Sequence, residues 1–194
     1  FAIATVAWVI GFYGPSVYLV SLTQKHGWSV AQISSTITAY YVASAVLTGF
    51  AGELYQRYHP AALVSGATLA LALGLALLGV IDKPWQLYPA FGLIVLGWSL
   101  TGGAGVYAIV GPWFDRRRGL AISITLTGAS FAGVITAPIW TALLPDHGFE
   151  EASRLIALGC AVTLIPLAWL SLRRLPAEGL PAFERRDTGA EAAR

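Results

Sequence analysis

Long apolar runs, separated by short polar connections, fill most of this chain. A helix needs about 20 mostly apolar residues to cross about 30 Å of hydrocarbon. Dividing the chain at its charged residues and Pro/Gly clusters places six spans at about residues 1–22, 30–54, 61–81, 87–114, 120–144 and 155–172. Because the connections are short, neighbouring helices must be antiparallel. The pattern predicts an all-α, polytopic membrane protein with a six-helix transmembrane bundle over residues 1–172.

The composition changes abruptly after the sixth run. Residues 173–194 are polar and contain two prolines and two glycines, which is typical of a flexible tail or of a linker to a second half. The chain has no Met and begins directly in an apolar run. We therefore expect a fragment of a longer protein.

The overall composition fits a membrane protein and excludes several other classes. Hydrophobic residues make up 56% of the chain and charged residues only 11%, against about 25% charged in soluble domains. Such a chain is neither disordered nor a nucleic-acid binder, and its one Cys permits no internal disulfide. It contains no His/Cys cluster with metal-ligand spacing, so we expect no metal and no cofactor. The expected surroundings are a lipid bilayer.

The positions of the cations predict the orientation. One set of connections and the tail carry Arg57, Arg116, Arg117, Arg118, Arg173, Arg174, Arg185, Arg186 and Arg194. The opposite connections carry Lys25, Lys83 and Arg154. Cytoplasmic loops are enriched in Lys and Arg, so both ends of the chain are expected in the cytoplasm. We expect the membrane to be a bacterial inner membrane.

The first, second, fourth and fifth spans carry most of the hydroxyls, tyrosines and paired glycines, and these four are the candidates to surround a path through the bundle. In the second span the small or polar positions recur at helical spacing: Ser34, Thr38, Tyr41, Ala45, Thr48 and Gly52. The fifth span has a comparable strip: Thr125, Gly128, Ala132 and Thr136. Small and hydroxyl residues also form ordinary helix-packing seams, so both interpretations stay open. The third and sixth spans are nearly all aliphatic and are expected outermost.

Catalysis is not encoded at membrane depth. No Asp, Glu, Lys, Arg or His lies near the middle of a span, so a buried proton relay is not predicted. Ser130 follows Gly128 and Ala129 much as a nucleophile would, but no His is placed to activate it. The sequence predicts that the chain is not an enzyme.

Three stretches stand out: residues 11–18 (GFYGPSVY) with 26–29 (HGWS), residues 111–121 (GPWFDRRRGLA), and residues 128–133 (GASFAG) with Pro138. Together they resemble the major facilitator superfamily of transporters, most closely its monocarboxylate and oxalate/formate branch. The resemblance covers about residues 8–175. It implies the amino-terminal half of a twelve-helix fold, in which two six-helix bundles surround a central solute site.

The sequence departs from the family pattern at two places. In the loop after the second span Gly52 and Arg57 match, but Gln56 replaces an Asp, His59 a Gly and Ala61 an Arg. Some monocarboxylate carriers have a Lys directly after the proline of the first span, where this chain has Ser16. A cation that pairs with an anionic solute would then come from the other half of the carrier, or the solute is not an anion.

The resemblance implies secondary transport of a small organic solute, with monocarboxylates and dicarboxylates as candidates, by alternating access. The candidate solute-lining residues are Tyr13, Ser16, Tyr41, Tyr107 and Ser130. The candidate gating and loop residues are Gly52, Arg57, Asp115, Arg116, Arg117 and Arg118. The expected partner is a second six-helix half, in the same polypeptide or in a partner subunit. The alternative is a six-span structural or assembly subunit without transport of its own.

Overall fold

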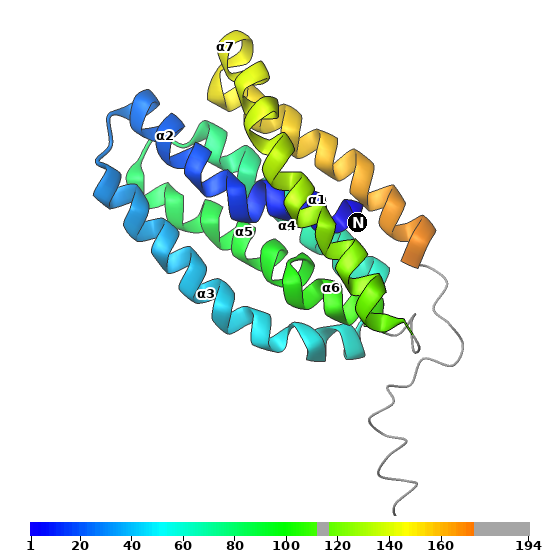
Figure 1. Ribbon diagram of the computed structural model, residues 1–194. Coiled ribbons are helices and arrows are strands. Elements are labelled where there is room, and N and C mark those ends of the chain that lie inside the picture. The colour runs from blue at the N-terminus through cyan, green and yellow to red at the C-terminus, as the bar shows by residue number, and fades with distance from the viewer. Residues whose placement is uncertain (112–116, 173–194) are drawn as a thin grey trace, which may run out of the picture.

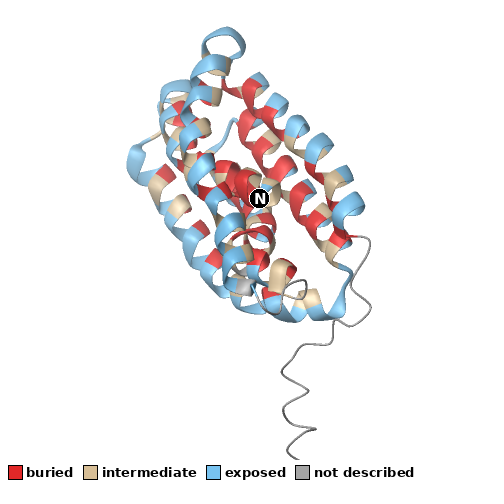
Figure 2. Ribbon diagram, turned by 45° about the vertical axis from the view of Figure 1, so that its right-hand side comes forward, coloured by how far each residue is buried: buried red, intermediate tan, exposed pale blue. Residues whose placement is uncertain are grey.

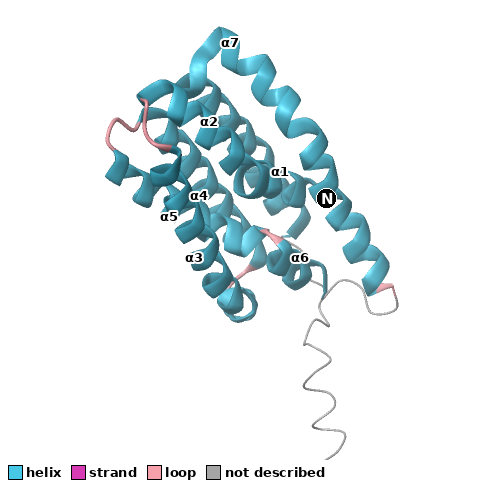
Figure 3. Cartoon of the chain, turned by 60° about the vertical axis from the view of Figure 1, so that its left-hand side comes forward, coloured by secondary structure: helices cyan, strands magenta, loops and turns pink. Residues whose placement is uncertain are grey.

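The computed structural model describes residues 1–111 and 117–172, and within them the chain is helical with only short connections (Figure 3). The first span consists of α1 (Ala2–Trp8), a π-helical turn η1 (Val9–Tyr13) and α2 (Gly14–His26). It is followed by α3 (Val30–Arg57), α4 (Pro60–Val80), the 3₁₀ turn η2 (Pro84–Gln86), α5 (Leu87–Thr101), α6 (Gly103–Val110) and α7 (Arg118–Leu172). The predicted all-α polytopic class is confirmed.

Local sequence signals explain where several helices begin. Ser29 caps α3, because its hydroxyl accepts a hydrogen bond from the Gln32 amide at 3.2 Å. The His59 ring accepts from the Ala61 amide at 3.2 Å, and Pro60 occupies the first position of α4, where its missing N–H costs nothing. In the connection before α5, the Gln86 side chain accepts from the amides of Asp82 and Lys83 at 2.8 and 2.9 Å.

The last helix contains two antiparallel arms rather than one rod. We expected a ten-residue connection over 145–154, but the helical run continues to residue 147 and reverses at Gly148, whose φ is 68° and ψ 174°. A residue with a Cβ rarely adopts this backbone conformation, so glycine makes the short reversal possible. Figure 1 shows the front arm, 118–147, rising to this turn and the rear arm, 149–172, returning beside it.

The fourth apolar run is also divided. We expected one span over 87–114, whereas the structure breaks it at Gly102, whose backbone is extended, into α5 and α6. After the break the chain passes so near α5 that a Cβ at position 105 would lie 1.8 Å from the Leu100 carbonyl oxygen. Only glycine fits at position 105, whereas a Cβ at position 103 would meet no atom within 4 Å.

Among the described residues, five helical stretches are long and apolar enough to cross a membrane, and the last of these includes both arms of α7. Their connections alternate between two ends of the bundle. The connections 27–29 and 81–83 and the turn of α7 lie toward the upper left and top of Figure 1, and the ends of α3, α6 and the rear arm lie toward the lower right. We call these the outer and inner ends, after the predicted orientation.

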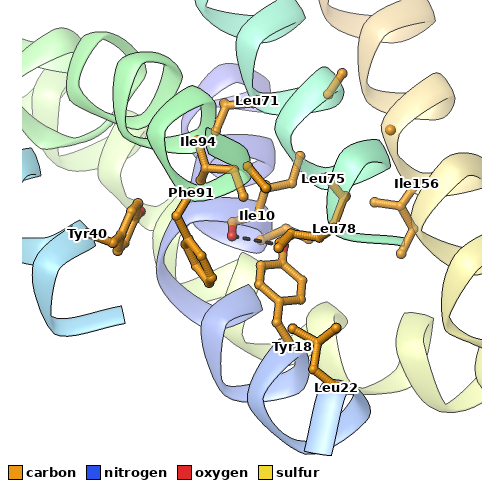
Figure 4. Packing of buried hydrophobic residues seen from close by; sticks show 14 of the residues in the cluster. Ile10, Tyr18, Leu22, Tyr40, Leu71, Leu75, Leu78, Phe91, Ile94 and Ile156 are labelled. Carbon is orange, nitrogen blue, oxygen red and sulfur yellow. Dashed lines mark hydrogen bonds between the residues drawn. The ribbon is translucent and has the colours of Figure 1, made fainter. Parts of the chain in front are cut away.

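The core lies where the first span, α4, α5 and α7 meet. Its largest buried side chains include Trp140, Tyr18 and Phe91. Figure 4 shows Tyr18 and Phe91 among leucines of α4 and Ile94 of α5. Each helix has a buried stripe toward this core and an exposed stripe on the outside (Figure 2). On α4 and on the rear arm of α7 the exposed stripe is largely aliphatic, with Leu69, Leu73, Leu158 and Val162 in it. Such stripes suit contact with lipid tails.

Candidate functional site

A proline sets the structure of the first span at its middle. In an α-helix the N–H of residue 15 would pair with the Gly11 carbonyl, and in a π-helical turn with the Ile10 carbonyl. Residue 15 is Pro and has no N–H, and the π-helical turn η1 ends two residues before it. The sequence of the first span therefore creates backbone oxygens that need donors from elsewhere.

Tyrosine hydroxyls supply these donors. Tyr18 donates to the Ile10 carbonyl at 3.0 Å from within the same span, as the dashed line in Figure 4 shows. Tyr40, on α3, donates to the Gly11 carbonyl at 2.6 Å, and its neighbour Tyr41 reaches the next carbonyl, that of Phe12, at 3.3 Å. Three consecutive carbonyl groups thus accept hydrogen bonds from tyrosines, two of them from α3.

Tyr40 and Tyr41 are adjacent but meet different surroundings. Tyr40 is 2% exposed and its ring lies 5.6 Å from that of Phe91, whereas Tyr41 is 39% exposed. The buried side of α3 consists of Ile33, Thr36, Tyr40, Ser44 and Ala51. The boundary between the packed and open sides of α3 therefore runs between these two tyrosines.

The small and polar strip predicted on the second span lies on the open side of α3. Thr38, Tyr41, Ala45 and Gly52 are exposed, and the other two members, Ser34 and Thr48, are half-buried. Gly52 has open space where a Cβ would stand. This strip is therefore not a packing seam within the described part of the chain.

The comparable strip on the fifth span is packed against another helix. Gly128, Ala132 and Thr136 are buried, and the front arm of α7 packs against α1. A Cβ at position 128 would lie 2.8 Å from the Phe1 carbonyl oxygen and from the Thr5 hydroxyl oxygen. The strip is a seam of small residues that brings two helices close together. Ser130, which lies off the strip, is exposed.

The first span carries two of the predicted solute-lining residues. Ser16 is exposed, and its hydroxyl donates to the Tyr13 carbonyl at 2.7 Å. Tyr13 is half-buried beside the front arm of α7, where a Cβ at position 133 would lie 2.8 Å from the tyrosine hydroxyl. Tyr13 belongs to the π-helical turn, and the hydroxyls of Ser16 and Tyr41 each donate to a carbonyl of that turn.

The other two predicted residues lie farther along the open side. Tyr107, on α6, is 48% exposed, and Ser130 is exposed on α7. Within the described residues, no hydrogen bond or aromatic contact joins Tyr107 or Ser130 to the group around η1. The structure brings three of the five candidates together and leaves two apart.

The sequence analysis did not identify Phe12 as part of this group. Phe12 is 44% exposed, and its ring lies 4.7 Å from Trp8 and 6.3 Å from Trp98. Trp8 and Trp98 make an edge-on contact at 5.3 Å, which fixes the wall behind Phe12. The one signal in the sequence was the position of Phe12 three residues before Pro15, where the helix cannot be regular.

The ion pairs among the described residues lie near the two ends of the bundle. At the outer end Glu150 pairs with Arg154 at 2.8 Å and lies 3.9 Å from Lys25, which also donates to the Gly79 carbonyl at 2.8 Å. At the inner end Arg57 pairs with Glu53 at 2.5 Å on the same helix. The open side around η1 therefore offers hydroxyls and aromatic rings rather than charges.

The predicted inner loop motif is only partly visible. Arg117 is exposed directly before α7, and Arg118 is the first residue of that helix. Asp115 and Arg116 lie outside the described residues.

Comparison with known proteins then decides the family. A family model of the Major Facilitator Superfamily matches residues 1–192. The chain belongs to this superfamily. The prediction of the family is confirmed, and the protein is a multi-pass integral membrane protein.

Individual relatives of this superfamily chain come from several kingdoms. Monocarboxylate transporter 13 of Bos taurus is 30% identical over 191 residues, which cover 95% of this chain and 41% of the bovine protein. The MFS-type transporter pynF of Aspergillus niger is 27% identical over 66% of this chain and 30% of its own length. The uncharacterized MFS-type transporter YcxA of Bacillus subtilis is 22% identical over 74% of this chain and 36% of its own length. The chain thus spans about a third of the length of the curated relatives it matches.

Proposed function

We propose that this superfamily chain is one half of a secondary transporter that moves a small organic solute by alternating access. The single observation that supports this most directly is the open strip of α3, where Thr38, Tyr41 and Ala45 are exposed while a separate side of the helix, with Tyr40 and Ser44, is buried. Polar groups at membrane depth face protein or a water-filled cavity when they can. The strip is suited to face a solute path between two bundles.

The proposed solute-lining residues are Tyr13, Ser16, Tyr41, Tyr107 and Ser130. Their role is neutral hydrogen bonding and aromatic contact, since the described residues place no charged side chain on the open side near η1. If the solute is a monocarboxylate or a dicarboxylate, as the name of the bovine relative suggests for that protein, its charge is paired by a cation of the second half. That half is the proposed partner, in the same polypeptide or as a second subunit.

The proposed orientation follows the cations. We place both ends of the chain, with Arg57 and Arg117, on the cytoplasmic side, and the end with Lys25, Lys83 and Arg154 outside. Gly52, Arg57 and residues 115–118 would then form the cytoplasmic gating region. The bacterial inner membrane stays a prediction, since the relatives include fungal and bovine proteins. A structural subunit without transport is not favoured, because these relatives are named as transporters.

The test is solute uptake by membrane vesicles that contain the full-length protein. The uptake of a panel of radiolabelled small carboxylates is compared with the uptake of uncharged analogues of similar size. For a solute that the wild-type protein takes up, the uptake rate of the Tyr107→Leu variant is compared with that of the Tyr88→Leu variant. Both tyrosines are exposed, Tyr107 by 48% and Tyr88 by 60%, but Tyr88 lies near the outer start of α5.

We expect Tyr107→Leu to reduce uptake about tenfold, as the loss of one solute contact would, and Tyr88→Leu to leave it within about twofold. Equal uptake by both variants would remove Tyr107 from the solute path. Failure of the wild-type protein to take up any member of the panel, although it is correctly inserted, would contradict transport of such solutes.

A further inference from the structure

The π-helical turn of the first span cannot satisfy its own hydrogen bonds. Position 15 is Pro, so neither the Gly11 carbonyl nor the Ile10 carbonyl can receive the N–H that a helix would offer from that position. Both oxygens belong to buried residues, where an unpaired backbone group is costly. The turn therefore depends on donors supplied by side chains.

These donors are not equivalent. Tyr18 lies eight residues from Ile10 in the same span, so its bond links neighbouring turns of one helix. The bond from Tyr41 to the Phe12 carbonyl is long, at 3.3 Å, and exposed. Tyr40 forms the shortest of the three bonds, at 2.6 Å, is almost completely buried, and connects two spans 29 residues apart.

The turn determines where several exposed side chains point. Phe12 and Tyr13 belong to it, and Ser16 follows it by one helical turn. A π-helical turn contains one residue more than an α-helical turn, so its loss rotates the preceding helix against the following one by about 100°, the angle of one residue. Phe12 and Ser16 would then no longer share the open side.

We propose that Tyr40 is a positioning residue of the solute site: its hydroxyl holds the π-helical turn against α3 and thereby sets the direction of Phe12 and Ser16. This inference rests on the proposed function only for its transport readout. Tyr40 itself does not reach the solute, since it is 2% exposed. Its ring packs against Phe91, so replacement by Phe removes the hydroxyl and keeps the packing.

The first experiment measures side-chain direction without any solute. Every variant of the full-length protein carries Ser16→Cys in a background from which the other cysteines, Cys160 included, are replaced by Ser. The rate of labelling by N-ethylmaleimide is then measured in detergent micelles. We expect Tyr40→Phe to change this rate about fivefold or more, since exposure of the thiol controls its access. The control, Tyr88→Phe, removes a hydroxyl from an exposed tyrosine near the outer end and should leave the rate unchanged.

A double variant separates positioning from simple stabilisation. Pro15→Ala restores an N–H that can pair with the Gly11 carbonyl within an ordinary α-helical turn. Tyr40→Phe combined with Pro15→Ala should therefore unfold at a higher temperature than Tyr40→Phe alone, but should keep the altered labelling rate. If Tyr40→Phe, folded and monodisperse, labels at the wild-type rate, the proposal is overturned. It is also overturned if the double variant returns to that rate.

The second experiment uses uptake of radiolabelled lactate as the probe, with Ser16 and Cys160 intact. We expect Tyr40→Phe to raise KM about tenfold, as a displaced contact would, while the maximal rate per inserted molecule stays within about threefold. An unchanged KM contradicts the positioning role. If wild-type protein does not transport lactate, that result bears on the proposed substrate class, whereas the labelling rates still decide the role of Tyr40.

Discussion

Helices α4 and α5 touch at Gly97, and this contact allows a quantitative test of the packing. A Cβ at position 97 would lie 2.4 Å from the Ala67 carbonyl oxygen and 2.5 Å from Cγ of Leu71. The first neighbour is backbone in the middle of a helix and cannot rotate away. Gly97→Ala must therefore push α4 and α5 apart by roughly 1 Å to restore ordinary contact distances.

The expected magnitude combines two opposed effects. Overpacking a tight site costs about 1–3 kcal/mol, and backbone as the obstacle favours the upper end of that range. Replacing Gly by Ala in a helix gains about 1 kcal/mol from backbone propensity. We therefore expect Gly97→Ala to lower the free energy of unfolding by about 2 kcal/mol.

Gly92 of the same helix provides the matched control, because nothing lies within 4 Å of a Cβ built there. Gly92→Ala makes the same change in propensity without a clash and should raise the free energy of unfolding by up to about 1 kcal/mol. Denaturant unfolding of the full-length protein in micelles, followed by circular dichroism, measures both variants. If Gly97→Ala is as stable as Gly92→Ala, the close approach of α4 and α5 is wrong.

Two further outcomes are expected. The Tyr55 hydroxyl donates a hydrogen bond of 2.8 Å to the Leu100 carbonyl, beside the break between α5 and α6. Tyr55→Phe removes this bond and should lower the free energy of unfolding by about 1 kcal/mol in the same denaturation assay. An unchanged free energy of unfolding would mean that the bond does not stabilise the break. In right-side-out vesicles of a Cys160→Ser background, a membrane-impermeant maleimide should label Lys83→Cys but not Arg57→Cys, and the reverse pattern would invert the proposed orientation.

The small and polar strips of α3 and α7 show what helical periodicity can predict and what it cannot. Both repeat small and hydroxyl residues at helical spacing, and on sequence alone both fitted a packing seam as well as a solute path. In the structure Gly128 and Ala132 pack against the first span, while Thr38 and Tyr41 stay exposed. Periodicity defines which residues share a face, but the partner of that face depends on helices distant in the chain.

The sequence by itself determined the class of the protein, the approximate positions of its apolar runs, and its superfamily. The class and the apolar runs follow from local quantities, since about 20 apolar residues in succession suffice to predict a membrane helix whatever surrounds them. The superfamily was indicated by the resemblance of three short stretches. Only the tertiary structure decided which tyrosine of α3 satisfies the first span. Pro15 shows in the sequence that carbonyl groups lack a donor, but the donor to Gly11 comes from Tyr40, 29 residues away. Hydrogen bonds between distant segments depend on how the helices pack, and no local pattern encodes that arrangement.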